Sequence, residues 1–122
     1  MPPSMRPDST MIMYGIPNCD TIKKARALLD RHGIAYEFHD YKKLGISPAL
    51  LKKWCNSFGY ENVLNRRGTT WRKLDDESKL ELNESSAISL MQELPSLIKR
   101  PVLDTGAKLL LGFDQSEYES LL

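Results

Sequence analysis

The sequence predicts an α/β fold, a four-stranded mixed sheet interrupted by a block of short helices. Strand, helix and strand patterns follow one another over residues 11–41, and a hairpin pattern follows residue 100. A strand–helix–strand order forms a right-handed unit with parallel strands, whereas a hairpin adds antiparallel strands. The two patterns together therefore predict a mixed sheet with helices packed around it.

The first part of the chain predicts two strands joined by a helix. The apolar run Met11–Tyr14 ends at a glycine, a proline and an asparagine within residues 15–18. Helical spacing runs from Asp20 to Gly33, and glycine commonly stops a helix. The apolar face of this helix comprises Ile22, Ala25, Leu28 and Leu29. Alternation over Tyr36–Tyr41 predicts the second strand.

The middle of the chain predicts several short helices. Ser47 fits an N-cap and Pro48 the first helical position, and this helix should end at Gly59. Further helices are expected at 62–64, at 74–82 and from Asn83 or Glu84 to residue 94. The polar, basic stretch 65–70 between them is expected to be a loop.

The end of the chain returns to strand. Pro101–Asp104 and Lys108–Gly112 flank a glycine-containing turn, which predicts a hairpin. A last helix is expected over Asp114–Leu122. We therefore expect one domain over residues 11–122, with a helical insert from about residue 45 to residue 97.

Composition narrows the classes of function. The 122 residues carry a net charge of only +1, which argues against a direct nucleic-acid partner. No apolar run is long enough to span a membrane. Residues 1–10 hold three prolines and no apolar stretch, so they predict a disordered extension rather than a signal peptide. We expect a cytoplasmic monomer.

Cys19 is the residue with the clearest chemical potential. It lies where the first strand turns into the first helix, so unpaired backbone N–H groups and the helix dipole favour negative charge there. Such a position lowers a thiol pKa, and the same geometry binds oxyanions. The hypothesis is a nucleophilic thiolate beside an anion-binding loop.

The cysteine count limits the redox chemistry. Cys19 and Cys55 are the two cysteines, and Ile22 occupies the place that a second cysteine would take in a C-x-x-C pair. A second thiol must therefore come from Cys55, a small molecule or another protein. The histidines and cysteines show no metal-ligand spacing, so no metal site and no bound cofactor are expected.

Three segments carry a family resemblance: residues 14–25 around the cysteine, the basic stretch 64–74, and residues 98–103 with an arginine–proline pair. Together they resemble the arsenate reductase (ArsC)/Spx family, most closely its YffB-type members. The resemblance implies a thioredoxin-like core with a helical insert, and a cis peptide bond at Pro101 close to the cysteine.

The resemblance also implies substrate-binding arginines. Arg100 matches one by its place before the hairpin, and Arg67 or its neighbour Arg66 matches another in the basic loop. Arginine suits this role because its planar, permanently charged fork pairs with carboxylates and oxyanions.

Two residues beside the cysteine leave alternatives open. Asn18 fits the binding loop or an N-cap, and Thr21 offers its hydroxyl to Cys19 or serves the first helical turn. The expected site therefore comprises Cys19, with Arg100, Arg67, Asn18, Thr21 and Pro101 binding substrate or glutathione.

One departure from the family pattern bears on the reaction. Arsenate reductases carry a third arginine where this chain has Phe113, so arsenate reduction is disfavoured. The expected function is a thiol-dependent oxidoreductase that forms a mixed disulfide with glutathione, its co-substrate. Another small thiol, or a protein disulfide as substrate, is also open. The alternative is a non-enzymatic, Spx-like regulator that binds RNA polymerase.

Overall fold

The computed structural model describes residues 11–121, and it divides into two compact units. The sheet unit comprises the described residues up to Asp40 and from Arg100 onward. The helical unit is Tyr41–Lys99. The extension expected over residues 1–10 lies outside the described residues.

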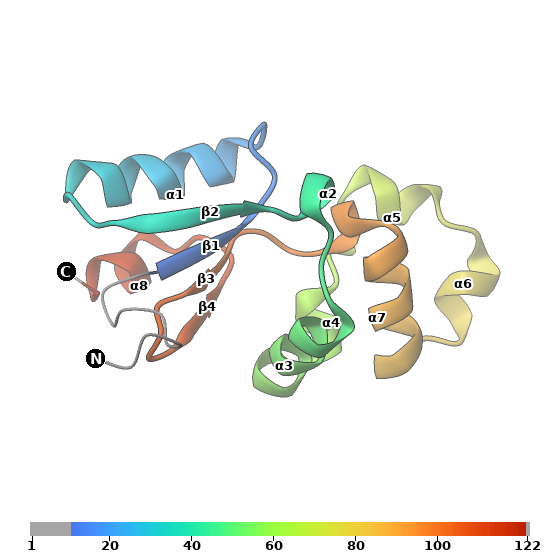
Figure 1. The fold of residues 1–122 in the computed structure, drawn as a ribbon. Coiled ribbons are helices and arrows are strands. Elements are labelled where there is room, and N and C mark those ends of the chain that lie inside the picture. The colour runs from blue at the N-terminus through green and yellow to red at the C-terminus, as the bar shows by residue number, and fades with distance from the viewer. Residues whose placement is uncertain (1–10, 122) are drawn as a thin grey trace. The chain divides into compact units, whose positions relative to one another are not determined.

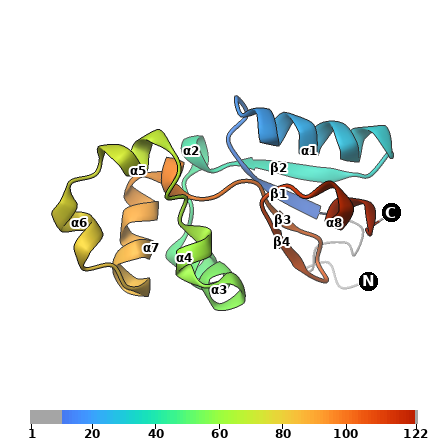
Figure 2. The ribbon, with the colours of Figure 1, turned by 180° about the vertical axis from the view of Figure 1, so that it is seen from behind.

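The sheet unit contains the four-stranded mixed sheet that the sequence predicts. Its strands are β1 Met11–Gly15, β2 Tyr36–Asp40, β3 Val102–Asp104 and β4 Leu109–Leu111. Their order is β2-β1-β3-β4 (Figures 1 and 2). β1 pairs parallel with β2 and antiparallel with β3, and β3 pairs antiparallel with β4. The predicted α/β class is thereby confirmed.

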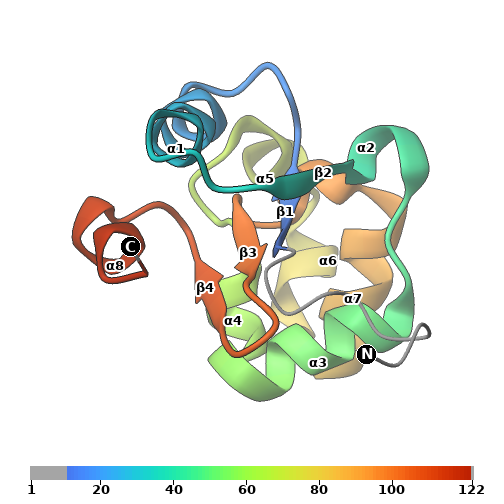
Figure 3. The same cartoon turned by 60° about the vertical axis from the view of Figure 1, so that its left-hand side comes forward.

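Two helices lie on the same side of this sheet, α1 Asp20–Arg31 and α8 Gln115–Glu119 (Figure 3). Side chains alternate across a strand, so one face of the sheet meets the apolar stripe of α1. The buried cluster between them comprises Met13, Ile22, Ala25, Leu28, Leu29, Leu103, Leu110 and Tyr118. The core therefore fixes the axis of α1 against the centre of the sheet.

A close approach at Gly15 sets where α1 begins. Gly15 ends β1 and is buried, and a Cβ placed on it would collide with the side chain of Ile22. Ile22 is fully buried in the first turn of α1. Because no side chain separates them, the helix start packs directly on the end of the central strand, and this contact positions the intervening loop with Cys19.

The helical unit consists of short helices. They are α2 Tyr41–Leu44, α3 Pro48–Phe58, α4 Tyr60–Val63, α5 Thr69–Lys73, α6 Asp76–Leu80, α7 Glu84–Glu93 and the 3₁₀ turn η1 Pro95–Leu97. Ser47 caps α3 as predicted, since its hydroxyl accepts a 3.1 Å hydrogen bond from the Leu50 amide. The buried core of this unit comprises Tyr41, Leu51, Trp54, Cys55, Val63, Leu64, Ala87, Met91, Leu97 and Ile98.

Several predicted boundaries in the helical unit are wrong. Tyr41 begins α2 instead of ending β2, because its hydroxyl donates a 3.0 Å hydrogen bond to the Ile98 carbonyl and its ring is buried. Thr69–Thr70 open α5 rather than lying in a loop, as α5 packs against η1. These contacts join residues distant in sequence, which local spacing cannot reveal.

Other elements differ only at their ends. The helix expected at 62–64 is α4, Tyr60–Val63, and that expected at 74–82 is α6, Asp76–Leu80. α1 ends at Arg31, two residues before the glycine taken as its stop. Among residues 11–121, no helix is both long and apolar enough to cross a bilayer.

The packing of Gly15 on Ile22 predicts a specific double-mutant result. Gly15→Ala should lower the free energy of unfolding by about 1–3 kcal/mol, because the added methyl group overpacks the core. Ile22→Val alone should cost about 0.5–1.5 kcal/mol, since it deletes one buried methyl group. The double variant should lose less stability than the sum in urea unfolding, because the shorter side chain makes room for the alanine. Strict additivity would contradict this contact.

Candidate active site

Cys19 is the N-cap residue of α1. Its backbone is extended, with φ −131° and ψ 129°, and its carbonyl accepts the first helical hydrogen bond from the Lys23 amide at 2.9 Å. The interpretation of Asn18 as the N-cap is therefore wrong; Asn18 is exposed and lies one residue before the N-cap. The cysteine occurs at the one position whose side chain faces the free amides of the first turn.

The N-cap position explains which amides act on the sulfur. An N-cap side chain normally accepts from the second and third helical residues, which here are Thr21 and Ile22. The Cys19 side chain makes no capping hydrogen bond of standard geometry, as expected of a weakly accepting neutral thiol. A thiolate is a better acceptor, so these amides favour the ionised form.

Opposing effects determine the pKa of Cys19. Burial raises the pKa, while hydrogen bonding from the Ile22 amide, the Arg100 side chain and the Thr21 amide lowers it. The positive charge of Arg100 lowers the pKa further, and the net shift is downward. The sulfur is half-buried, so it keeps access to solvent while water screens its partners less than in bulk.

Sheet pairing accounts for the position of Arg100. β3 runs antiparallel to β1, with Val102 opposite Tyr14. The residues just before β3 therefore lie at the same end of the two central strands as the loop that follows β1. Arg100 is half-buried at this end, where its side chain acts on the Cys19 sulfur.

Pro101 anchors the start of β3. The Arg100–Pro101 peptide bond is cis, and Pro101 is buried. Its carbonyl accepts a 2.8 Å hydrogen bond from the Gly112 amide, which ties the start of β3 to the end of β4. Pro101 thus belongs to the segment that holds Arg100 in place.

The predicted site residues divide between the two units. The sheet unit contains Cys19, Thr21, Arg100 and Pro101, and brings the first three together electrostatically. Thr21 acts on the sulfur through its backbone amide; a role for its hydroxyl stays a prediction. Arg67 is exposed in the helical unit, so its pairing with Cys19 also stays a prediction.

The Ile22 amide is a contributor that sequence reasoning missed. Ile22 attracts notice in the sequence as the residue that replaces a second cysteine, whereas in the structure its amide is the strongest of the groups that lower the Cys19 pKa. Ile22 is the third helical residue only when Cys19 is the N-cap; an N-cap at Asn18 would have indicated the Thr21 amide instead.

Phe113 contributes packing where the family pattern has a cation. Its ring lies edge-on to the ring of Tyr118, with 4.9 Å between centroids, and it packs against the buried cluster of the sheet unit. An aromatic ring held in this way supplies no charge to an oxyanion.

Cys55 differs from Cys19 in its burial and in the direction of its pKa shift. It is buried in α3, and burial together with the Glu84 and Glu61 carboxylates raises its pKa. A thiol with a raised pKa is a poor nucleophile at neutral pH. Within the described residues, no group of three or more His, Cys, Asp or Glu side chains is placed to hold a metal ion.

Comparisons with known proteins place these features in context. The model of the ArsC family matches residues 14–121. The solved structure of a YffB protein is 52% identical, covers 90% of this chain and 96% of its own, and has a TM-score of 0.88. An arsenate reductase-related protein from Brucella melitensis is 45% identical, with coverage of 98% and 97% and a TM-score of 0.73.

Another relative is named as a transcriptional regulator rather than for arsenate reductase. The global transcriptional regulator Spx of Streptococcus mutans is 31% identical over 108 residues, covering 87% of this chain and 78% of its own. The similarities therefore include one protein named as a regulator and one named for its relation to arsenate reductase.

The electrostatics of Cys19 predict the effect of removing its cation. Arg100→Gln should raise the thiol pKa, because the variant loses both a charged donor and a nearby positive charge. The test is the pH dependence of alkylation by iodoacetamide in a Cys55→Ser background, where the midpoint should move to higher pH.

Arg31→Gln is the matched control for this experiment. Arg31 is exposed in the last turn of the same helix, and its loss changes the net charge equally. An equal shift in both variants would mean that the general field of the protein, rather than Arg100, lowers the pKa.

Proposed function

Since this chain belongs to the ArsC family, we propose that it is a thiol-dependent oxidoreductase with glutathione as its reducing co-substrate. The observation that carries this proposal is the lowered pKa of Cys19 at the N-cap of α1, beside Arg100. A thiolate is the nucleophile in thiol–disulfide exchange, and a lowered pKa raises the fraction of thiolate at neutral pH.

The proposed reaction has two exchange steps. In the first, the Cys19 thiolate attacks the glutathione sulfur of a mixed disulfide, forms a Cys19–glutathione disulfide and releases the substrate as a thiolate. In the second, the thiolate of another glutathione attacks that disulfide, releases oxidised glutathione and regenerates the Cys19 thiolate. Overall, the substrate sulfur is reduced from disulfide to thiolate, and the sulfur of the incoming glutathione is oxidised from thiolate to disulfide. This cycle needs a compartment that keeps glutathione reduced, for which we propose the cytoplasm.

Each predicted site residue has a role in this scheme. Arg100 keeps Cys19 ionised and, with Arg67, pairs with glutathione carboxylates. The amides at the start of α1 stabilise the negative sulfur when it departs as a leaving group in the second step. Asn18, Thr21 and Pro101 border the bound tripeptide.

Arsenate reduction is disfavoured. Phe113 replaces an arginine of the family pattern, and its ring packs against Tyr118. A tetrahedral oxyanion would lack one of its cationic partners, so its binding should be weak.

A regulatory role is the second candidate, supported by the similarity to Spx of Streptococcus mutans. An Spx-like protein would bind RNA polymerase through this fold without turning over a thiol. Ile22 removes the second cysteine of a C-x-x-C switch, and its side chain is fully buried in the core. Regulation here would therefore not use a disulfide within that loop.

Incubation with oxidised glutathione tests the enzymatic proposal. Mass spectrometry should find one glutathione adduct on the wild type and on Cys55→Ser, and none on Cys19→Ser, because the shifts in thiol pKa favour attack by Cys19. Turnover of a glutathione mixed disulfide should follow the same pattern. Full turnover in Cys19→Ser would overturn the proposal.

The same protein preparations distinguish the regulatory role from the enzymatic one. Recovery of RNA polymerase on the immobilised protein, combined with no glutathione-dependent turnover, would favour the Spx-like role. Activity with arsenate, glutathione and glutaredoxin is expected to be negligible for the wild type.

A further inference from the structure

A groove between α3 and α7 lies within the helical unit and has a volume of about 420 Å³. The two helices pack against each other. We call this feature the α3–α7 groove, and its lining includes Ala49 and Lys52 from α3 and Glu84, Ser85, Ile88 and Ser89 from α7. Its volume is near the lower end of the range for pockets that hold small molecules, so it suits a ligand of amino-acid or dipeptide size.

Contacts at both ends of α7 hold the walls of the groove in place. Near the end of α7, the Gln92 side-chain amide donates a 3.3 Å hydrogen bond to the Ile46 carbonyl, just before α3. At the start of α7, the Asn83 side chain accepts a 2.9 Å hydrogen bond from the Ser86 amide, and the Ser86 hydroxyl accepts one of 3.0 Å from the Asn83 amide. The same two helices bury Leu51, Ala87 and Met91 in the core. A ligand therefore meets preformed walls, and its binding needs little further ordering of the backbone.

The two walls carry opposite charges. Lys52 lines the groove from α3 and Glu84 lines it from α7. In the part of the chain that the structure describes, neither of them forms an ion pair. Glu84 is half-buried, and a carboxylate that has lost part of its hydration is stabilised by an ionic partner. A molecule that carries both an ammonium and a carboxylate group would supply the missing partner to each side chain.

The surface between these charges combines apolar and hydroxyl groups. Ile88 of α7 and Ala49 of α3 give it aliphatic side chains. Ser85 and Ser89 lie one helical turn apart on the same face of α7 as Ile88, and their hydroxyls can both donate and accept hydrogen bonds. An aliphatic side chain and a peptide group would therefore both find matching neighbours here.

We propose that the α3–α7 groove binds a small zwitterion with an aliphatic side chain, an amino acid or a dipeptide. Lys52 pairs with its carboxylate, Glu84 pairs with its ammonium group, and Ile88 and Ala49 contact the aliphatic side chain. The groove includes no residue assigned to thiol chemistry or to glutathione. The proposal therefore goes beyond the oxidoreductase activity and does not depend on it.

Binding is tested by NMR titration of the full chain, which reports affinity and location together. The probes are L-leucine and glycyl-L-leucine, and the blocked forms are leucinamide, which lacks the carboxylate, and N-acetylleucine, which lacks the ammonium group. At least one unblocked probe should bind saturably and shift the amide signals of Ser85–Ser89. Each blocked form should bind about tenfold more weakly than leucine, because it loses one charge-assisted hydrogen bond. The tighter unblocked probe tells whether the ligand is an amino acid or a dipeptide.

Substitutions assign each charge of the probe to a side chain. Lys52→Gln should weaken the binding of leucine and of N-acetylleucine about tenfold, and leave leucinamide unaffected, since leucinamide has no carboxylate to lose a partner. Glu84→Gln should give the opposite pattern, because it removes the partner of the ammonium group. General loss of structure in the groove would instead weaken all probes equally in both variants.

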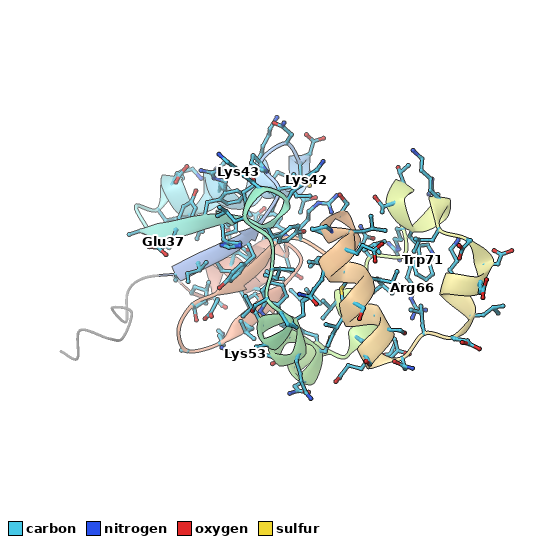
Figure 4. All side chains as sticks on the ribbon, turned by 45° about the vertical axis from the view of Figure 1, so that its right-hand side comes forward. Glu37, Lys42, Lys43, Lys53, Arg66 and Trp71 are labelled. Carbon is cyan, nitrogen blue, oxygen red and sulfur yellow. The ribbon has the colours of Figure 1, made fainter. Side chains whose placement is uncertain are left out.

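Two neighbouring residues provide matched controls. Lys53, labelled on α3 in Figure 4, is exposed and follows Lys52 in sequence, and Glu93 is exposed at the end of α7. Neither lines the groove, so Lys53→Gln and Glu93→Gln change the net charge equally and should leave binding unchanged. Cys19→Ser should bind the probes as the wild type does, which separates this proposal from the enzymatic one.

Circular dichroism checks that each variant is folded. The proposal is overturned if neither unblocked probe binds saturably, or if the blocked forms bind as tightly as leucine. An equal loss of affinity in Lys53→Gln and Lys52→Gln, or an equal weakening of all probes in the two groove variants, would overturn it as well.

Discussion

The interaction on which the site depends is that between the sulfur of Cys19 and the free amides of the first turn of α1. A helix start carries N–H groups without intrahelical partners, and most helices satisfy one of them with a serine, threonine or aspartate oxygen. A neutral thiol does this poorly. Ionisation of Cys19 therefore gives the free N–H groups of the helix a good hydrogen-bond acceptor, and it also activates the nucleophile. Local folding and reactivity thus favour the same protonation state.

The rest of the sheet unit maintains this arrangement. The contact between Gly15 and Ile22 holds the helix start against the central strand. Antiparallel pairing of β1 with β3 brings Arg100 to the same end of these strands. Desolvation raises the pKa of Cys19, whereas the hydrogen bonds from the α1 amides and Arg100 lower it, and the net shift is downward. Partial burial of the sulfur is therefore a compromise, since deeper burial would favour the neutral thiol and full exposure would weaken its partners through solvent screening.

Much of the fold was predictable from local sequence, because strands and helices have different apolar periods. The helix over Asp20–Arg31, the hairpin and the Ser47 cap all follow from short-range patterns. What escaped prediction depends on contacts between distant residues. Tyr41 begins a helix, and its hydroxyl donates a hydrogen bond to the Ile98 carbonyl. Thr69 and Thr70 are helical and α5 packs on η1, although β-branched residues are poor helix formers.

The site shows the same division. Cys19 could be identified from its place between a strand and a helix, and Arg100 from the family resemblance. The choice of Cys19 rather than Asn18 as the cap decides which amides reach the sulfur, and a one-residue difference of this kind is below what periodicity resolves. The place of Arg67 relative to the cysteine depends on tertiary arrangement that no local pattern encodes.

The burial of Ile22 has a consequence for how long an oxidised form of the protein would persist. Where a C-x-x-C protein keeps a resolving thiol one helical turn away, this chain has an aliphatic side chain enclosed by the core. No neighbouring sulfur in that turn can release a partner bound to Cys19. The lifetime of such an adduct would then depend on the concentration of free thiols around the protein, so its occupancy would follow the redox state of the surroundings.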